Sequence, residues 1–137
     1  MFAVDTLGGL VAGDTVAVIG PGPIGLTVAQ ILKALRAFLV ILTGTRGSRL
    51  RLGLELGPDI VVDAGATDAA DVVCDATGGA GVDAVPECSG AEVAVDQAIR
   101  MSMPGGRIVL VGFFHGPVTC RPQPRSQNRT DPAHDSR

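Results

Sequence analysis

Short runs of β-branched and other apolar residues alternate along this chain with segments in which apolar positions recur at helical spacing. Runs in which nearly every residue is apolar are typical of strands buried on both faces of a sheet. Apolar positions that recur at helical spacing are typical of amphipathic helices. The expected strands are residues 15–19, 38–43, 60–63, 82–88 and 107–113. The expected helices are residues 23–36, 48–56, 67–76 and 91–103.

Two of these segments carry conflicting signals. Between residues 48 and 56, leucines at every second position would also suit a strand, and Gly53 costs a helix about 1 kcal/mol. We favour a helix because Ser48 can cap its start and the Gly57-Pro58 pair can end it. In segment 82–88, Pro86 has no N–H group to donate to a neighbouring strand, so we expect this strand to be weakened there.

The alternation of strands and helices predicts an α/β fold of the Rossmann type, a doubly wound parallel sheet covered by helices on both faces. Right-handed crossovers and a reversal after the third strand give the strand order 3-2-1-4-5, with the sixth strand missing. The turn Pro104-Gly105-Gly106 should introduce the fifth strand. Residues 1–119 are expected to form this one domain, and the polar segment 120–137 is expected to be a disordered tail.

Composition narrows the class of protein. The 137 residues suit one domain, and 46% hydrophobic residues suffice for a core. A net charge of −3 and the absence of Trp and Tyr argue against a nucleic-acid partner and a membrane surface. Neither a leader pattern nor an apolar run of roughly 18 residues is present, so we expect a soluble, cytoplasmic protein. Three widely spaced cysteines predict neither a disulfide framework nor a structural zinc site.

The most informative segment is Gly20-Pro21-Gly22-Pro23-Ile24-Gly25, a G-x-G-x-x-G pattern that directly follows an apolar strand and opens a helix. Gly20 allows a tight turn, Gly22 lets a pyrophosphate approach the backbone, and Gly25 lets the helix pack closely. The helix N-terminus adds free N–H groups and partial positive charge. We therefore predict a dinucleotide site. The alternative, an ordinary turn that packs a helix, is less consistent with three glycines placed within one βαβ unit.

The end of the second expected strand bears on the choice of cofactor. NAD-binding domains usually place an acidic residue there, about 20 residues after the glycine motif, to accept a hydrogen bond from the ribose 2′-hydroxyl. This chain has Gly44 at that place, followed by Arg46 and Arg49, and either guanidinium could bind a 2′-phosphate. The pattern favours NADP over NAD. The alternative is that both arginines are solvated residues at the start of a helix.

Four motifs in order resemble the cofactor domain of zinc-dependent medium-chain dehydrogenases, the family of alcohol, sorbitol and threonine dehydrogenases. They are residues 13–26, the T-G-G-x-G-V-D pattern at 77–83, the E-x-S-G pattern at 87–90 and the P-G-G-x-x-V-x-x-G pattern at 104–112. The likeness extends over about residues 3–119. It implies an NAD(P)-binding domain of an oxidoreductase that moves hydride between a nicotinamide and an alcohol or carbonyl carbon.

The resemblance also implies roles for matching positions. At the pyrophosphate it implies Gly20, Gly22, Pro23, Ile24 and Gly25; at the adenosine ribose it implies Gly44, Thr45 and Arg46, with Arg49 beyond them. On the nicotinamide side it implies Cys88, Ser89 and Gly90, and in contact with the nicotinamide Val111, Gly112 and Phe113. For these last two groups, ordinary packing at the strand ends is the alternative. A homodimer formed through the sheet edge is a further implication.

Departures from the family matter as much. Its members carry a separate domain in which Cys, His and Glu ligands hold zinc, whereas His115 and His134 stand alone here. We therefore assign no catalytic residue and no metal ligand, and expect a fragment that binds cofactor without turnover. Arg36, where the family tends to have a helix-ending glycine, together with Pro58 and Pro86, suggests marginal stability. A stand-alone regulatory module and a non-functional gene fragment remain alternatives, whereas a methyltransferase is disfavoured by Gly44.

Overall fold

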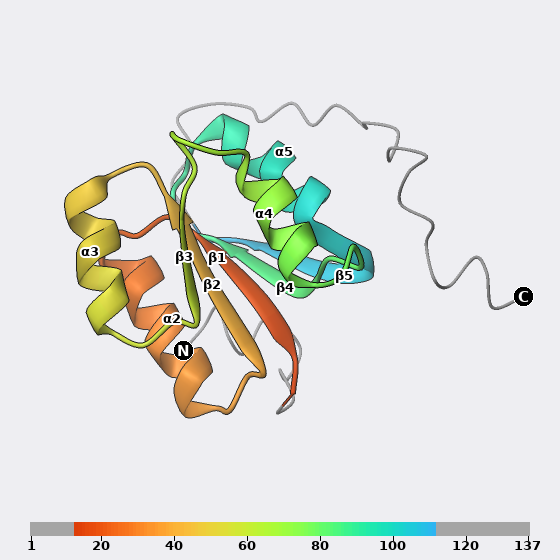
Figure 1. Ribbon diagram of the computed structural model, residues 1–137, viewed down its shortest axis with the longest axis horizontal. Coiled ribbons are helices and arrows are strands. Elements are labelled where there is room, and N and C mark those ends of the chain that lie inside the picture. The colour runs from red at the N-terminus through yellow and green to blue at the C-terminus, as the bar shows by residue number, and fades with distance from the viewer. Residues whose placement is uncertain (1–12, 112–137) are drawn as a thin grey trace, which may run out of the picture.

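The computed structural model describes residues 13–111 of the chain. All nine expected elements are present there, with some shifted ends (Figure 1). The strands are β1 Thr15–Ile19, β2 Leu39–Gly44, β3 Ile60–Asp63, β4 Val82–Glu87 and β5 Ser102–Leu110. The helices are α2 Pro23–Ala34, α3 Gly47–Glu55, α4 Ala69–Ala76 and α5 Glu92–Met101. The expected strand end at Phe113, and the boundary between a domain at 1–119 and a tail at 120–137, lie outside the described residues.

The five strands form one parallel sheet in the order β3-β2-β1-β4-β5, as the sequence predicts. Helices α2 and α3 lie on one side of this sheet and α4 and α5 on the other (Figure 1). The two-residue period of a strand divides β1 between the two cores. Val16 and Val18 pack in the cluster that holds the buried face of α2, whereas Ala17 and Ile19 pack in the cluster of α4 and α5.

Gly53 explains the mixed signal in the third helical segment. A Cβ atom at this position would lie 2.5 Å from the Cδ2 atom of Leu42, a fully buried residue of β2. The glycine therefore lets α3 pack closely against β2, which offsets its low helix propensity. The segment is a helix, as expected, although the expected Ser48 cap is wrong. Arg46 occupies the N-cap position, and no side chain caps this helix.

Helix α4 begins two residues later than expected, because Asp68 is its N-cap. The Asp68 carboxylate accepts hydrogen bonds from the N–H groups of Ala70 (3.0 Å) and Asp71 (3.3 Å). Arg100 of α5 donates to the same carboxylate at 2.7 Å and so ties the two helices together. This hydrogen bond, helped by the backbone donors, holds the pKa of Asp68 below its usual value although partial burial opposes the shift.

The expected start of the fifth strand at Arg107 is wrong, as is the expected end of the preceding helix at residue 103. Helix α5 ends at Met101 and β5 begins immediately at Ser102. Ser102 pairs with Val82 and Arg107 pairs with Ala84, so residues 103–106 leave the ladder as a bulge. The expected turn at residues 104–106 falls inside this bulge. Pairing with β4 through Ser102, which a local sequence pattern does not reveal, extends the strand beyond the turn.

Pro86 lies within β4, opposite Val109 of β5. The N–H of Cys88 donates to the Ile19 carbonyl of β1 at 2.7 Å, so alternate N–H groups of this strand face β1. Position 86 faces the same way and has no N–H, which removes one hydrogen bond between two central strands. The strand persists because it is buried on both faces and paired on both sides. It ends at Glu87, one residue earlier than expected.

Arg36 ends α2 in a conformation that favours glycine. Its φ is +63°, the one positive φ of a non-glycine residue among residues 13–111. The N–H of Arg36 donates to the Lys33 carbonyl and the N–H of Ala37 to the Leu32 carbonyl, both at 3.1 Å. This is the hydrogen-bond pattern of a Schellman motif, in which the left-handed position is usually glycine. This geometry supports the expectation that an arginine at this position lowers stability.

We expect Arg36→Gly to raise the free energy of unfolding by about 1 kcal/mol, because it removes the steric cost of a Cβ atom in the left-handed region. Urea denaturation followed by circular dichroism would measure the change. Arg36→Ala, which removes the guanidinium but keeps the Cβ atom, serves as the control and should gain little. An equal gain in both variants would assign the effect to the side chain instead of the backbone.

Candidate functional site

A cavity of about 420 Å³ opens at the carboxyl ends of β1, β2 and β4. This is where an open α/β sheet changes direction, since β1 connects to β2 on one side and pairs with β4 on the other. The loops that follow β1, β2 and β4 meet there, together with the start of α2. The lining residues are Ile19, Gly20, Pro21, Gly22, Pro23, Thr43, Gly44, Thr45, Arg46, Arg49, Ala64, Cys88, Ser89, Ala91, Val93, Ala94 and Gln97.

The turn between β1 and α2 packs against its neighbours without intervening side chains. Gly20 has a φ of +102°, and its N–H donates to the Thr43 carbonyl at 2.8 Å. A Cβ atom on Gly20 would lie 2.8 Å from the Ser89 nitrogen, and one on Gly25 would overlap the Gly20 carbonyl oxygen. Glycine is therefore required at both positions, at the first by conformation and at both by space.

Gly22 differs from these two glycines because the space beside it is open. Its φ is −75°, which any residue can adopt, and the atom nearest to a Cβ built there is Nη1 of Arg49 at 3.9 Å. Gly22 is the N-cap of α2 and offers no side-chain cap, and Pro23 follows at the first helical position. The first turn of α2 carries no acidic residue. The positive end of α2 therefore borders the cavity through Gly22 and Pro23, and no side chain caps its first N–H groups.

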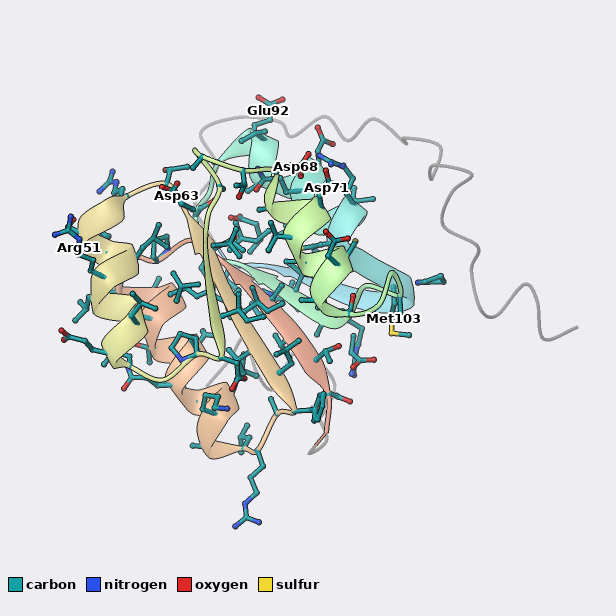
Figure 2. All side chains as sticks on the ribbon, viewed as in Figure 1. Arg51, Asp63, Asp68, Asp71, Glu92 and Met103 are labelled. Carbon is teal, nitrogen blue, oxygen red and sulfur yellow. The ribbon has the colours of Figure 1, made fainter. Side chains whose placement is uncertain are left out.

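Charge in the cavity is positive. Arg46 and Arg49 line it, and no carboxylate stands among its described lining residues. Figure 2 shows Asp63, Asp68, Asp71 and Glu92 at the ends of β3, α4 and α5, and Arg51 on the outer side of α3. None of those side chains lines the cavity. The arrangement suits an anionic ligand that lies across the start of α2.

The structure brings most predicted site residues together. Gly20, Gly22, Pro23, Gly44, Thr45, Arg46, Arg49, Cys88 and Ser89 all line the cavity. Ile24, Gly25, Gly90 and Val111 do not, whereas Gly112 and Phe113 lie outside the described residues. Their assignment as cofactor ligands stays a prediction. Gly25 acts from behind the cavity wall, by allowing α2 to approach the Gly20 carbonyl.

Several lining residues were not predicted: Ile19, Pro21, Thr43, Ala64, Ala91, Val93, Ala94 and Gln97. Those on α5 lie at helical spacing, which places them on one face of the helix, but the sequence does not indicate that this face meets a cavity. Thr43 precedes the last residue of β2, and the alternation of this strand points its side chain away from α2. Its hydroxyl is buried and has no hydrogen-bond partner. Spacing alone cannot identify such residues, because the sheet brings them together from distant parts of the chain.

Glu87 was expected only as part of a family motif, yet it holds the turn between β4 and α5. Its carboxylate is fully buried and accepts hydrogen bonds from the N–H groups of Ser89 (2.7 Å) and Gly90 (3.2 Å). It also accepts a short hydrogen bond from the Ser89 hydroxyl, which in turn accepts from the Ala91 N–H at 3.1 Å. These donors satisfy the buried charge and fix the turn beside Gly20. A glutamate that ends an apolar strand is the signal that could have revealed it.

Cys88 lies at the cavity wall next to this carboxylate. Burial raises the pKa of its thiol to about 12, and the neighbouring charge of Glu87 adds to the rise. The thiol is therefore neutral at physiological pH and is a poor nucleophile or metal ligand. Within residues 13–111, no three His, Cys, Asp or Glu side chains are grouped so that they could hold a metal ion.

No helix among the described residues has the length and apolar character needed to cross a membrane.

Comparisons with known proteins agree on one family. Residues 23–130 match the family model described as zinc-binding dehydrogenase. An L-threonine 3-dehydrogenase of Thermococcus kodakarensis is 40% identical over 118 residues, which cover 85% of this chain and 34% of that protein. A D-arabitol-phosphate dehydrogenase of Enterococcus avium is 41% identical over 102 residues, which cover 74% of this chain and 29% of that protein. The chain thus spans about a third of the length of the curated relatives it matches.

Solved structures show the same fold. An alcohol dehydrogenase from Thermus sp. ATN1 superposes with a TM-score of 0.80 at 31% identity, covering 92% of this chain and 36% of that chain. A zinc-binding dehydrogenase from Sinorhizobium meliloti 1021, bound to NADP in its crystal, also gives a TM-score of 0.80, at 33% identity. That match covers 87% of this chain and 36% of that chain.

The environment of Cys88 leads to a prediction about its reactivity. Because its pKa is about 12, the thiolate fraction at pH 8 should be about a thousandfold lower than for an ordinary cysteine. We expect iodoacetamide to label Cys88 correspondingly slowly, with a rate that rises about tenfold per pH unit from pH 8 to pH 10 without a plateau. Mass spectrometry of the Cys88 peptide, with urea-unfolded protein as the control, would measure the rates. Equal rates in folded and unfolded protein would contradict the prediction.

Proposed function

Since the chain belongs to the zinc-binding dehydrogenase family and spans its NAD(P)-binding region, we propose that the cavity at the strand ends is the site of the dinucleotide. The observation that carries the proposal is the open space beside Gly22 at the uncapped start of α2. A diphosphate placed there would accept hydrogen bonds from the helix N–H groups and lie in their positive field. The nearby Arg49 guanidinium would add a charge-assisted contact.

The topology also orients the ligand. The end of β2 takes the adenosine ribose in folds of this kind, so Gly44, Thr45 and Arg46 would lie beside that half. Cys88 and Ser89, at the end of β4, would then lie on the nicotinamide side, and Gly90 in the same turn would support them. The bound cofactor supplies the hydride chemistry, and the role of these residues is to bind and orient it. Glu87 serves this role indirectly, by holding the turn.

We further propose that the site favours NADP. Gly44 provides no carboxylate for a ribose 2′-hydroxyl, and the exposed Arg46 lies at the same strand end. The NADP that the related Sinorhizobium meliloti chain binds supports this preference. Arg49, whose Nη1 atom lies near Gly22, is better placed for the diphosphate than for a 2′-phosphate.

The proposal for this chain alone is binding without turnover. The described residues hold no grouped metal ligands, and the curated relatives are about three times as long as the matched part. Hydride transfer to an alcohol or carbonyl would accordingly need groups beyond residues 13–111. Two lesser proposals accompany this one. The outer edge of β5, where Leu110 is exposed, would pair two copies. Cys74 and Cys88 form no disulfide among the described residues, which suits a reducing cytoplasm.

We expect Gly22→Ala to weaken NADPH and NADH binding at least about tenfold, because the methyl group takes the space of the diphosphate. The free energy of unfolding should fall by no more than about 1 kcal/mol, since nothing in the protein lies closer than 3.9 Å. Isothermal titration calorimetry would measure affinity. Gly47→Ala, with no atom within 4 Å of its Cβ, is the control and should bind normally. Failure of the unaltered protein to bind either dinucleotide at millimolar concentration would refute the proposal.

Alanine variants of three arginines should distinguish contacts with the diphosphate from contacts with the 2′-phosphate. We expect Arg46→Ala to weaken NADPH binding about tenfold and to leave NADH binding nearly unchanged, because only NADPH carries a 2′-phosphate. Arg49→Ala should weaken both. Arg51→Ala, which removes an equal charge from the outer side of α3 (Figure 2), should change neither. Equal effects of Arg46→Ala on the two dinucleotides would contradict the proposed preference.

A further inference from the structure

Gly44 is required by its neighbour and not by its own backbone. Its φ lies outside the left-handed region, so an L-residue could adopt the same conformation. A Cβ atom built there would nevertheless lie 2.5 Å from the Cγ atom of Pro21 and closer still to its Cδ atom. Ordinary contacts of this kind begin at 3.4 Å. The pyrrolidine ring of Pro21, in the glycine loop (residues 20–22) between β1 and α2, therefore occupies the space that any side chain at position 44 would need.

Neither partner can withdraw easily. The Gly20 N–H donates to the Thr43 carbonyl at 2.8 Å. This hydrogen bond joins the residue before Pro21 to the residue before Gly44, so it holds the turn after β1 against the end of β2. The Ala64 N–H donates to the Gly44 carbonyl at 2.8 Å, and Gly44 pairs with Asp63 of β3. Because the ring of Pro21 includes its own backbone nitrogen, the ring cannot rotate away as a flexible side chain would. Relief of the overlap requires a shift of the loop or of the strand.

We propose that Pro21 is a specificity-determining residue of the dinucleotide site, because its ring excludes a carboxylate at position 44. This inference rests on the proposed function, in which the end of β2 faces the adenosine ribose. An acidic side chain there would accept from a 2′-hydroxyl and repel a 2′-phosphate. With Pro21 in place, that side chain cannot be accommodated, and Arg46 remains the charged group at this end. The preference for NADP thus depends on Pro21 and Gly44 together and not on Gly44 alone.

The geometry of Pro21 indicates how to reopen the position. Its Cβ atom lies 3.5 Å from the Cβ built on Gly44, an ordinary contact. The overlap comes entirely from Cγ and Cδ, which alanine lacks. Pro21→Ala should therefore make room for a side chain at position 44 while it keeps the contact that both residues can share.

A stability cycle tests the contact without any cofactor. Four proteins are compared by urea denaturation: the unaltered chain, Pro21→Ala, Gly44→Ala and the double variant. We expect Gly44→Ala to raise the unfolding equilibrium constant at least about tenfold when Pro21 is present, and less than about threefold when it is combined with Pro21→Ala. Pro23→Ala is the matched control, because Pro23 lies two residues away at the start of α2 and is not among the residues nearest to Gly44. This change should not rescue Gly44→Ala. Equal losses with and without the Pro21→Ala change would overturn the proposal.

A binding comparison tests the consequence for specificity. The ratio of NADPH to NADH affinity is measured by calorimetry in the unaltered chain, in Pro21→Ala and in Pro21→Ala combined with Gly44→Asp. We expect the first two to favour NADPH and the combined variant to favour NADH at least about tenfold. A combined variant that folds and still favours NADPH would overturn the proposal. If the unaltered chain binds neither dinucleotide, the proposed function fails and the specificity role fails with it, whereas the stability cycle would still report the contact.

Discussion

Close contact between backbones at Gly20 is the constraint on which the site depends. Its N–H bonds to the end of β2, its Cα faces the turn after β4, and its carbonyl faces Gly25 of α2. Three segments that are distant in the sequence thus meet around one residue that has no side chain. The parallel strand order places β2 and β4 on either side of β1, and only glycine permits the approach that follows. The fold and the cavity are consequences of the same packing.

Electrostatics in the cavity follow from how the acidic groups are placed. Glu87 turns its carboxylate toward the N–H groups of its own turn, and Asp68 is bound by Arg100 and by the start of α4. Asp59 accepts from Lys33 at 2.9 Å and from the Val40 N–H at 2.8 Å, at the opposite end of β2. Asp68 and Asp59 are satisfied away from the cavity lining, whereas Glu87 is satisfied by its own turn, directly behind the lining residue Ser89. The start of α2 and the two arginines therefore supply the positive charge that an anionic ligand would meet.

Local imperfections of this chain lie mostly away from the cavity wall. Arg36 is strained at the far end of α2, where its carbonyl accepts from Gly13 ahead of β1. Pro86 removes a hydrogen bond between β1 and β4, but the next bond along, from Cys88 to Ile19, is intact. The chain can thus lose stability through these residues and still keep the geometry of the glycine turn. Stability and the geometry of the proposed dinucleotide site therefore depend on different residues of this chain.

The sequence by itself determined the element types, the strand order and the glycine turn, because periodicity and left-handed turns are local properties that a few neighbouring residues specify. It did not determine where β5 begins, since pairing of Ser102 with Val82 extends that strand past a glycine turn. It did not reveal the wall formed by α5, nor the contact that makes glycine necessary at position 44. Those features depend on which residues from separate segments come within van der Waals distance. Tertiary packing alone decides that, because steric exclusion acts over a few ångströms in space irrespective of separation along the chain.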